Sequence, residues 1–173
     1  MFLDFKKHIS VIPDWPSKGI ITYDIAPILH DSRLFHELIE QLSGPYKNQK
    51  IDTVIGIEAR GFILAGALAN QLGSGMVLIR KKGKTPPPTI SQEYSFEYAS
   101  YVMEVAGNIL QPNEQVVLVD DILATGGTMA AAVKLINKIG SKIIGISCAV
   151  EMESMAGRDR LKGQKIYSSI IYT

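Results

Sequence analysis

The chain contains 173 residues, of which 46% are hydrophobic and 20% are charged, and its formal net charge is +1. These values are typical of one globular domain, expected over residues 1–173, and the near-neutral charge gives no general reason to expect nucleic acid or an anionic membrane as a partner. A single cysteine excludes an internal disulfide, and the N-terminal MFLDFKKHIS lacks the apolar core of a secretory leader, so we expect a cytoplasmic protein.

The segment at residues 12–31, IPDWPSKGIITYDIAPILHD, is rich in turn-forming residues. Its three prolines and one glycine predict a covering segment without regular structure. The apolar side chains of Trp15, Ile20, Ile21 and Tyr23 favour a simple hydrophobic seal on the domain. On these residues alone, we prefer that interpretation to a binding role.

A helix is predicted next, from a cap at Asp31 to about Ser43. The apolar run Thr53–Ile57 then predicts a strand that is buried on both faces. The loop EARGF at residues 58–62 follows, and a helix of small residues ends at Gly73. Taken alone, the two charged residues of this loop are most simply surface charges.

A third strand is predicted at residues 76–79, and four cations follow within the five residues RKKGK at 80–84. Since this basic run is short and the chain is near neutral, it suits a compact polyanion better than nucleic acid. Three prolines at 86–88 favour an extended, mobile arm that could close over a substrate. The alternating pattern at 95–105 predicts a β-hairpin in which Glu97 faces water.

The stretch VVLVDDILATGGT, at residues 116–128, combines a central strand, two acids, a turn of small residues and a helix start. Asp120 and Asp121 are expected to end the strand. They could be a solvated strand end, but carboxylates beside an apolar strand need water or a ligand, and ribose hydroxyls would satisfy both. Gly126 and Gly127 permit close backbone approach, and the helix start offers N–H groups to a phosphate. The stretch therefore predicts a sugar-phosphate site.

The remaining elements complete an alternating pattern of strands and helices. A helix is predicted over residues 129–139, and strands over 143–150 and 166–172. Cys148 lies in an apolar run and is expected to be a core residue rather than a nucleophile. The three histidines have no metal-ligand spacing. We expect an α/β fold with a mainly parallel central sheet and helices on both faces.

VVLVDDILATGGT closely resembles the phosphoribosyl pyrophosphate motif of the type I phosphoribosyltransferases. The resemblance implies that fold, with the acids on the ribose hydroxyls and the turn around the 5-phosphate. The residues implied are Asp120, Asp121, Ala124, Thr125, Gly126, Gly127 and Thr128.

Two further segments resemble loops of the same family. EARGF resembles the pyrophosphate-binding loop, and the basic run with its prolines and SFEY resembles a loop, here residues 80–99, that covers the active site flexibly. The resemblance implies pyrophosphate contacts from Glu58, Ala59, Arg60, Gly61, Arg80, Lys81 and Lys84. It also implies catalytic roles for Arg60, Lys84 and Glu97, with Glu97 assisting the base.

The N-terminal segment, residues 1–30, resembles the hood that covers the purine in adenine phosphoribosyltransferases. The match includes Ile12, Pro13, Pro16, Gly19, Ile20, Asp24 and Ile25. Thr22 and Tyr23 depart from the usual Phe-Arg, so the identity of the base is less firmly implied than the sugar-phosphate chemistry. Base contacts are expected from Ile21, Thr22, Tyr23 and Tyr98.

Taken together, the resemblance implies a purine-salvage enzyme that joins adenine to 5-phosphoribosyl 1-pyrophosphate and releases AMP and pyrophosphate. It also implies Mg²⁺ bound through the substrate and a homodimer. Two alternatives stay open: a transferase for hypoxanthine, guanine or xanthine, and a non-catalytic sensor of phosphoribosyl pyrophosphate. The sensor is less favoured, because it would need neither the cationic arm nor Glu97.

Overall fold

The computed structural model describes residues 4–96 and 99–173. A large sheet contains β3 (Thr53–Ile57), β4 (Gly75–Lys81), β5 (Thr89–Phe96), β6 (Ala99–Ala106), β7 (Gln115–Leu123), β8 (Lys142–Met152) and β9 (Ile166–Tyr172). The α-helices are α1 (Ala26–His30), α2 (Ser32–Ser43), α3 (Gly61–Leu72) and α4 (Gly127–Ile139). Short 3-10 helices are η1 (Phe5–His8), η2 (Gly44–Tyr46), η3 (Glu153–Met155) and η4 (Gly157–Leu161). Within the described ranges, no helix is both long and apolar enough to cross a membrane.

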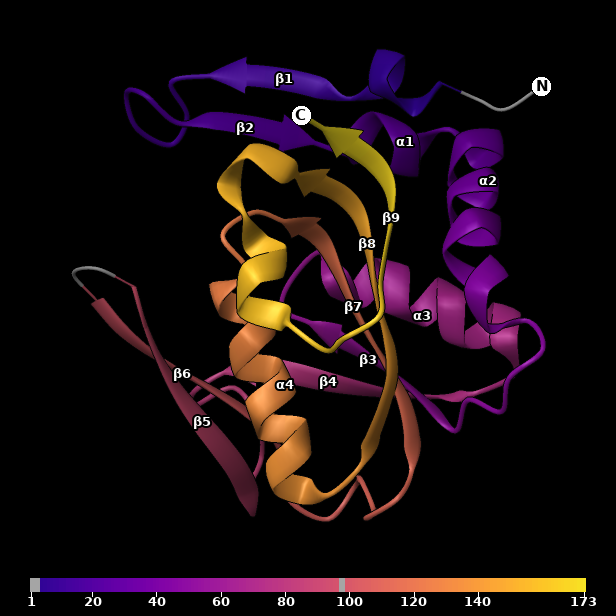
Figure 1. Ribbon diagram of the computed structural model, residues 1–173, viewed down its shortest axis with the longest axis vertical. Helices are drawn as coiled ribbons and strands as arrows, with labels where there is room; N and C mark the ends of the chain where they lie inside the picture. The colour runs from indigo at the N-terminus through magenta and orange to yellow at the C-terminus, as the bar shows by residue number, and fades with distance from the viewer. Residues whose placement is uncertain (1–3, 97–98) are drawn as a thin grey trace.

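The large sheet has the strand order β5-β6-β4-β3-β7-β8-β9 (Figure 1). The five strands from β4 to β9 in this order run parallel to one another, whereas β6 runs antiparallel to β4 and to β5. The predicted mainly parallel sheet is therefore confirmed. An antiparallel hairpin, β5–β6, extends one edge of it.

Both faces of the sheet are covered, and the side chains of β7 show how. Val117 and Val119 pack in one core cluster with residues of α2 and α3, while Val116 and Leu118 pack in a second cluster with residues of α4. Because successive residues of a strand point to opposite faces, an unbroken apolar run is needed where both faces are buried. Cys148 belongs to the second cluster, as predicted.

The predicted helix and strand boundaries agree closely with the structure in several places. Asp31 Oδ1 accepts hydrogen bonds from the backbone N–H groups of Arg33 at 2.9 Å and Leu34 at 3.0 Å, so it caps α2 as expected. The predicted bounds of β3 and β9 match the observed bounds. Strong local signals, a side-chain cap and short apolar runs, determine these elements.

The prediction that residues 12–31 lack regular structure was wrong. Two strands in this region, β1 (Ser10–Pro13) and β2 (Ile21–Asp24), form an antiparallel two-stranded sheet above the strand ends of β7, β8 and β9 (Figure 1). In the turn between them, Asp14 Oδ1 accepts a 2.6 Å hydrogen bond from Gly19 N, and Thr22 Oγ1 donates a 2.7 Å bond to the Trp15 carbonyl oxygen. The turn-forming residues therefore close a hairpin rather than prevent one.

The segment predicted as a flexible loop, residues 80–99, contains more regular structure than expected. β4 continues to Lys81, and β5 begins at Thr89. Ile90 and Tyr94 pack against the second core cluster, which explains why the strand starts so early. The predicted hairpin exists, and residues 97–98, including Glu97, lie outside the described residues.

Asp120 and Asp121 do not end their strand, because β7 continues to Leu123. The neighbouring strand β8 supplies partners beyond the acids, with Ile122 opposite Val150 and Leu123 opposite Glu151. The two carboxylates are therefore held within a regular strand. Their backbone is fixed on that side by β8.

Candidate active site

The loop between β7 and α4 surrounds a hollow of about 200 Å³. Helix α4 begins at Gly127 without a side-chain cap, and Gly126 before it has a left-handed conformation with φ of 75°. Backbone N–H groups at such a helix start can bind an anion. The structure brings Asp120 together with the loop predicted to bind the 5-phosphate; the lining residues are Asp120, Ile122, Leu123, Ala124, Thr125, Gly126, Gly127, Thr128 and Met129.

Gly157, at the start of η4, packs directly against this phosphate loop, residues 124–128. A Cβ atom added to Gly157 would lie 2.2 Å from the carbonyl oxygen of Ala124, and one added to Gly126 would lie 2.4 Å from the carbonyl oxygen of Gly157. Only residues without side chains allow two backbones to approach so closely. Gly157 therefore helps to fix the loop from outside the motif.

The ion pair between Glu151 and Arg158 holds the chain on either side of η3. Arg158 Nε donates to Glu151 Oε1 at 2.6 Å, and Arg158 Nη2 donates to Glu151 Oε2 at 2.8 Å. The hydrogen bond from Arg158 outweighs burial and lowers the pKa of Glu151. The ion pair is bidentate, and the Glu151 side chain is almost completely buried. The pair should therefore contribute measurably to the free energy of unfolding.

Replacing Glu151 with glutamine is expected to lower the free energy of unfolding by about 2 kcal/mol at pH 7, because a charge-assisted pair is lost. The carboxylate stabilises the folded state above its ordinary pKa of 4.5, and this contribution disappears as the pH falls through the lowered pKa. The gap between wild type and Glu151→Gln should therefore narrow as the pH falls below 4.5. Urea denaturation at a series of pH values measures it.

Glu93→Gln is the control, since Glu93 is exposed on β5, at the far edge of the sheet from β8 and β9. It should leave both the stability at pH 7 and its pH dependence unchanged. A difference in unfolding free energy between wild type and Glu151→Gln that stays constant down to pH 3 would show that the contribution of the pair does not depend on ionisation of the Glu151 carboxyl.

The two acids of β7 occupy different environments. Asp121 is buried and forms an ion pair with Arg60 through Oδ2 and Nε. Burial, and then the nearby Asp121 carboxylate, raise the pKa of Asp120, although part of that residue reaches the surface. Asp121 is therefore paired with Arg60, from a loop distant in the chain, and the sequence did not indicate this contact. Asp120 faces the hollow.

Gly61, the first residue of α3 and one of the predicted pyrophosphate contacts, packs closely against β7. A Cβ atom at this position would lie 2.9 Å from the Val119 carbonyl oxygen and 3.0 Å from Asp120 Oδ1. Gly61 is therefore required for packing against β7. This contact brings the EARGF loop, with its cis peptide bond between Glu58 and Ala59, next to the two acids.

The basic run folds into a turn in which Lys84 forms an ion pair with Glu58. Lys84 Nζ lies 2.6 Å from Glu58 Oε1, and the backbone N–H of Lys81 donates to Glu58 Oε2 at 2.8 Å. Burial would raise the pKa of Glu58, but the Lys84 and Lys81 contacts outweigh it and hold the pKa below its ordinary value. Arg80 Nη1 donates to the Lys84 carbonyl oxygen at 2.6 Å. The predicted pyrophosphate residues of both loops are thus brought together.

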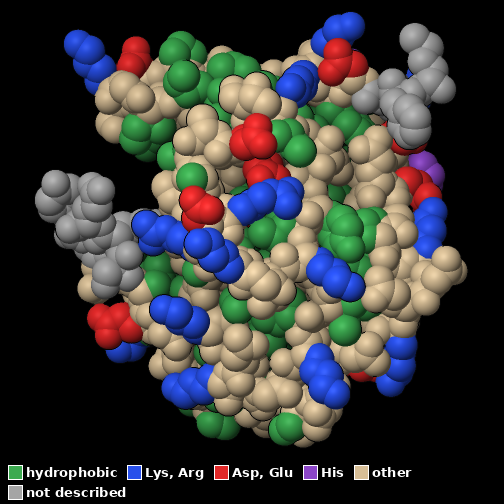
Figure 2. Space-filling view, in the orientation of Figure 1, with side chains coloured by type: hydrophobic (Ala, Val, Ile, Leu, Met, Phe, Trp, Pro, Cys, Tyr) green, Lys and Arg blue, Asp and Glu red, His purple; other side chains and the backbone are tan. Residues whose placement is uncertain are grey.

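The residues predicted to contact a base lie mainly in the β1–β2 hairpin. Figure 2 shows hydrophobic side chains gathered on this part of the surface. Within the hairpin, Trp15 is 57% and Ile21 is 54% exposed. The ring of Tyr23 packs against Tyr172, with centroids 4.4 Å apart. Since the ring of Tyr23 meets Tyr172, Ile21 is the more accessible of the predicted base contacts. Tyr98 lies outside the described residues.

A profile of the phosphoribosyl transferase domain matches residues 28–171. The chain belongs to this family. It is 42% identical over 165 residues to an adenine phosphoribosyltransferase of Syntrophotalea carbinolica, which covers 95% of this chain and 96% of the relative. The crystal structure of an adenine phosphoribosyltransferase from Thermoanaerobacter pseudethanolicus has a TM-score of 0.94 at 40% identity, covering 98% of both chains. That of Giardia lamblia, complexed with 9-deazaadenine, has a TM-score of 0.93 at 38% identity, covering 98% of this chain and 97% of that one. The resemblance stated from the motifs is confirmed.

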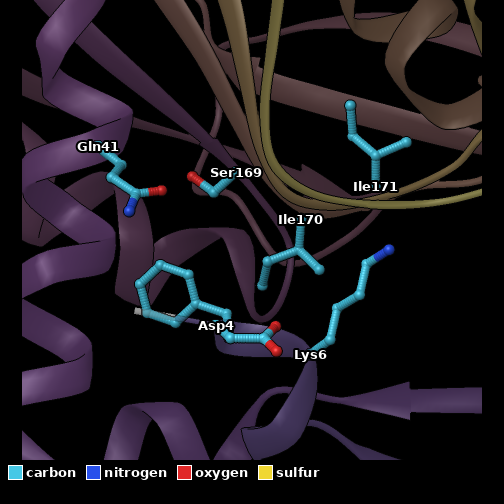
Figure 3. Close-up of a pocket in the computed structure, with 7 residues that line it drawn as sticks. Asp4, Lys6, Gln41, Ser169, Ile170 and Ile171 are labelled. Atoms are coloured by element: carbon cyan, nitrogen blue, oxygen red, sulfur yellow. The ribbon is translucent and has the colours of Figure 1, made fainter. Parts of the chain in front are cut away.

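This phosphoribosyltransferase has a second cavity, which contains no residue of the motif at 116–128. It has a volume of about 600 Å³ and lies among η1, α2 and β9, lined by Asp4, Phe5, Lys6, Gln41, Ser169, Ile170 and Ile171 (Figure 3). None of these residues belongs to the loops described above. The smaller hollow at the phosphate loop, rather than this cavity, is therefore the candidate active site.

Three residues that support the phosphoribosyltransferase site were missed by sequence reasoning. They are Gly157 beside the phosphate loop, Arg60 in its role as partner of Asp121, and Glu104 beneath the basic turn. Each acts through a contact between segments far apart in the chain. The sequence immediately around each of these residues gives no signal of such a contact.

Proposed function

We propose that this chain transfers the 5-phosphoribosyl group of phosphoribosyl pyrophosphate to adenine, which forms AMP and releases pyrophosphate. The observation that carries the proposal is the hollow at the phosphate loop, with Asp120 on its wall and the Arg60 and Lys84 loops nearby. Relatives named adenine phosphoribosyltransferase, at 42% to 45% identity, support the choice of adenine over an oxopurine.

The phosphate loop would hold the 5-phosphate through backbone N–H groups and the hydroxyls of Thr125 and Thr128. Asp120 and Asp121 would accept hydrogen bonds from the ribose hydroxyls. This places the anomeric carbon of the ribose between the base and the leaving group. The remaining loop residues, Ala124, Gly126 and Gly127, would leave room for the phosphate.

The leaving pyrophosphate would meet Arg60, Arg80, Lys81 and Lys84, with Glu58, Ala59 and Gly61 shaping the same pocket. The ion pair of Arg60 uses Nε, and its side chain is 44% exposed, so its terminal nitrogens can turn to a phosphate. Lys84 is 51% exposed and would exchange Glu58 for the substrate. Both cations stabilise the negative charge that builds on the departing oxygen.

In the reaction, the bond between the anomeric carbon and the pyrophosphate oxygen breaks, and a bond to a nitrogen of the purine forms on the opposite face. Pyrophosphate leaves with the bonding electrons, and the proton of that purine nitrogen passes to a proton-accepting side chain. We assign this proton transfer to Glu97, by resemblance. Ile21, Thr22, Tyr23 and Tyr98 would hold the purine, and closure of the arm at residues 80–99 would exclude water.

Mg²⁺ fits this site as an ion carried by the substrate. The described residues contain no group of three or more His, Cys, Asp or Glu side chains suited to a metal, whereas pyrophosphate offers the oxygen ligands that Mg²⁺ prefers. When bound, the ion would offset the charge of the leaving group. The protein's own contribution is the cationic pocket and the acids that orient the ribose.

The remaining parts of the proposal are a single domain over residues 1–173, a homodimer, a cytoplasmic location and a role in purine salvage. They rest on the resemblance to the family. In a homodimer, Arg80 and Lys81 could serve the site of the neighbouring subunit. Sedimentation equilibrium of the purified protein measures the oligomeric state directly.

Supplied with phosphoribosyl pyrophosphate and Mg²⁺, the enzyme is expected to release pyrophosphate with adenine and to prefer adenine to hypoxanthine, guanine and xanthine by at least about a hundredfold in kcat/KM. A site that hydrogen-bonds the amino edge of adenine leaves polar groups unpaired with an oxopurine. A pyrophosphate-release assay with each base, and with no base as the control, makes the measurement. Release only with an oxopurine would replace the named substrate, and no release with any base would favour a sensor.

A further inference from the structure

Glu104, on β6, is a buried carboxylate whose partners are backbone N–H groups of the basic turn. It is 5% exposed, and its Oε1 accepts hydrogen bonds from the N–H groups of Gly83 at 2.9 Å, Lys84 at 3.2 Å and Thr85 at 3.0 Å. In the sheet, Glu104 lies opposite Arg80, at the point where β4 runs into the turn. One oxygen atom therefore gathers three consecutive residues of the turn.

These hydrogen bonds make the turn and the carboxylate dependent on each other. A buried carboxylate is costly unless it is paired or hydrogen-bonded. Among the residues that the structure describes, no cation forms an ion pair with Glu104, so the N–H groups of the turn supply its compensation. If the turn at residues 83–85 changed conformation, the buried Glu104 carboxylate would lose these hydrogen bonds. Glu104 therefore stabilises the observed conformation of the turn.

The same turn carries a cation of the proposed leaving-group pocket. Lys84 donates its backbone N–H to Glu104, and its Nζ lies 2.6 Å from Glu58 Oε1. Glu58 also accepts the backbone N–H of Lys81. Two carboxylates thus hold the turn: Glu104, within β6, binds its backbone N–H groups, and Glu58, directly after β3, pairs with the Lys84 ammonium group.

We propose that Glu104 is a positioning residue that fixes the turn at residues 83–85 so that Lys84 is aimed at the pyrophosphate. The proposal rests on the function proposed above, because it gives Lys84 a pyrophosphate to bind. Glu104 itself is too buried to touch the substrate. Its effect should be confined to ligands that carry a pyrophosphate, since the 5-phosphate and ribose sites lie on β7 and its loop.

The test is Glu104→Gln, which keeps the shape of the side chain but replaces a charged acceptor with a weaker, neutral one. We expect the dissociation constants of pyrophosphate and phosphoribosyl pyrophosphate to rise about tenfold, while that of AMP, which has no pyrophosphate, changes less than about twofold. Calorimetric titration measures all three ligands. Hydrogen exchange should be faster at the amides of Gly83, Lys84 and Thr85 in the free variant.

Glu93→Gln, at an exposed position on the adjacent strand β5, is the control and should leave all three constants unchanged. A double-mutant cycle adds a second test: in a Lys84→Ala background, Glu104→Gln should weaken pyrophosphate binding by less than about twofold further, because the cation it positions is gone. If Glu104→Gln does not fold, Glu104→Asp keeps the charge with a shorter reach and should show the same selective loss.

Unchanged pyrophosphate binding in Glu104→Gln would overturn the proposal, and so would an equal loss for AMP and pyrophosphate. Failure of the proposed function would look different. It would show as no pyrophosphate release with any purine in the wild-type enzyme, whereas the binding measurements here compare variants without turnover.

Discussion

Gly157→Ala is expected to lower the free energy of unfolding by about 2 to 3 kcal/mol, because its methyl group would overlap a backbone oxygen that cannot rotate away. The added Cβ would lie 2.2 Å from the carbonyl oxygen of Ala124, inside the phosphate loop. Either the phosphate loop or η4 must therefore move. A displacement of about 1 Å in a substrate-positioning segment can cost about a hundredfold in rate, so we expect kcat/KM for phosphoribosyl pyrophosphate to fall by about that factor. Urea denaturation and steady-state kinetics measure the two effects.

Gly44→Ala is the matched control. Gly44 has an ordinary helical φ of −45°, and a Cβ atom there meets nothing within 4 Å. It should be neutral or stabilising by about 0.5 kcal/mol through loss of unfolded-chain entropy, with wild-type kinetics. If Gly157→Ala retained wild-type kcat/KM, the contact between η4 and the phosphate loop would have no role in holding the loop for catalysis.

The elements that the sequence predicted well are those determined by local signals. The apolar residues of β3 and the cap of α2 each lie within a few positions of the element they define. The β1–β2 hairpin was missed for the opposite reason. Its closing contacts, from Asp14 to Gly19 and from Thr22 to Trp15, join residues whose turn-forming types predict irregular chain. Composition identified the turn but could not show which strands it joins.

The candidate site divides in the same way. The phosphate loop is one continuous stretch, so its residues were predicted together and the structure brings them together around one hollow. Arg60 was expected to face a phosphate, yet it forms an ion pair with Asp121, because α3 packs against β7 through Gly61. Pairing between Arg60 and Asp121, which are 61 positions apart in the chain, depends on the sheet order, which no short pattern encodes.

This pairing gives the two acids separate physical roles. Asp121 is paired with Arg60 in the free protein, whereas burial and the neighbouring carboxylate raise the pKa of Asp120. On the proposed function, the Asp120 carboxyl would gain hydrogen-bond partners when ribose hydroxyls bind. The free energy of folding and the affinity for substrate are thus opposed at one residue.

Asp120→Asn is expected to weaken phosphoribosyl pyrophosphate binding by about tenfold to about a hundredfold while leaving the protein at least as stable at pH 7, since charged hydrogen bonds contribute about 1.5 to 3 kcal/mol. The amide keeps the oxygen that accepts the 2.9 Å bond from Asp121 N. The folded pKa of Asp120 is raised above its ordinary 3.8, so the wild-type carboxyl favours the folded state at lower pH and loses that contribution as the pH rises through the raised pKa. Asp120→Asn lacks this pH-dependent loss of stability. Its free energy of unfolding relative to that of the wild type should therefore increase as the pH rises.

Thermal unfolding from pH 4 to 8 and calorimetric titration with phosphoribosyl pyrophosphate measure the two halves of this prediction. Asp159→Asn, at an exposed position in η4, should change neither stability nor affinity. Lower stability of Asp120→Asn at pH 7 would mean that Asp120 is ionised and stabilising in the free protein, with Arg60 shared between both acids. Wild-type affinity in that variant would remove Asp120 from the ribose site and leave Asp121 as the acid that contacts the sugar.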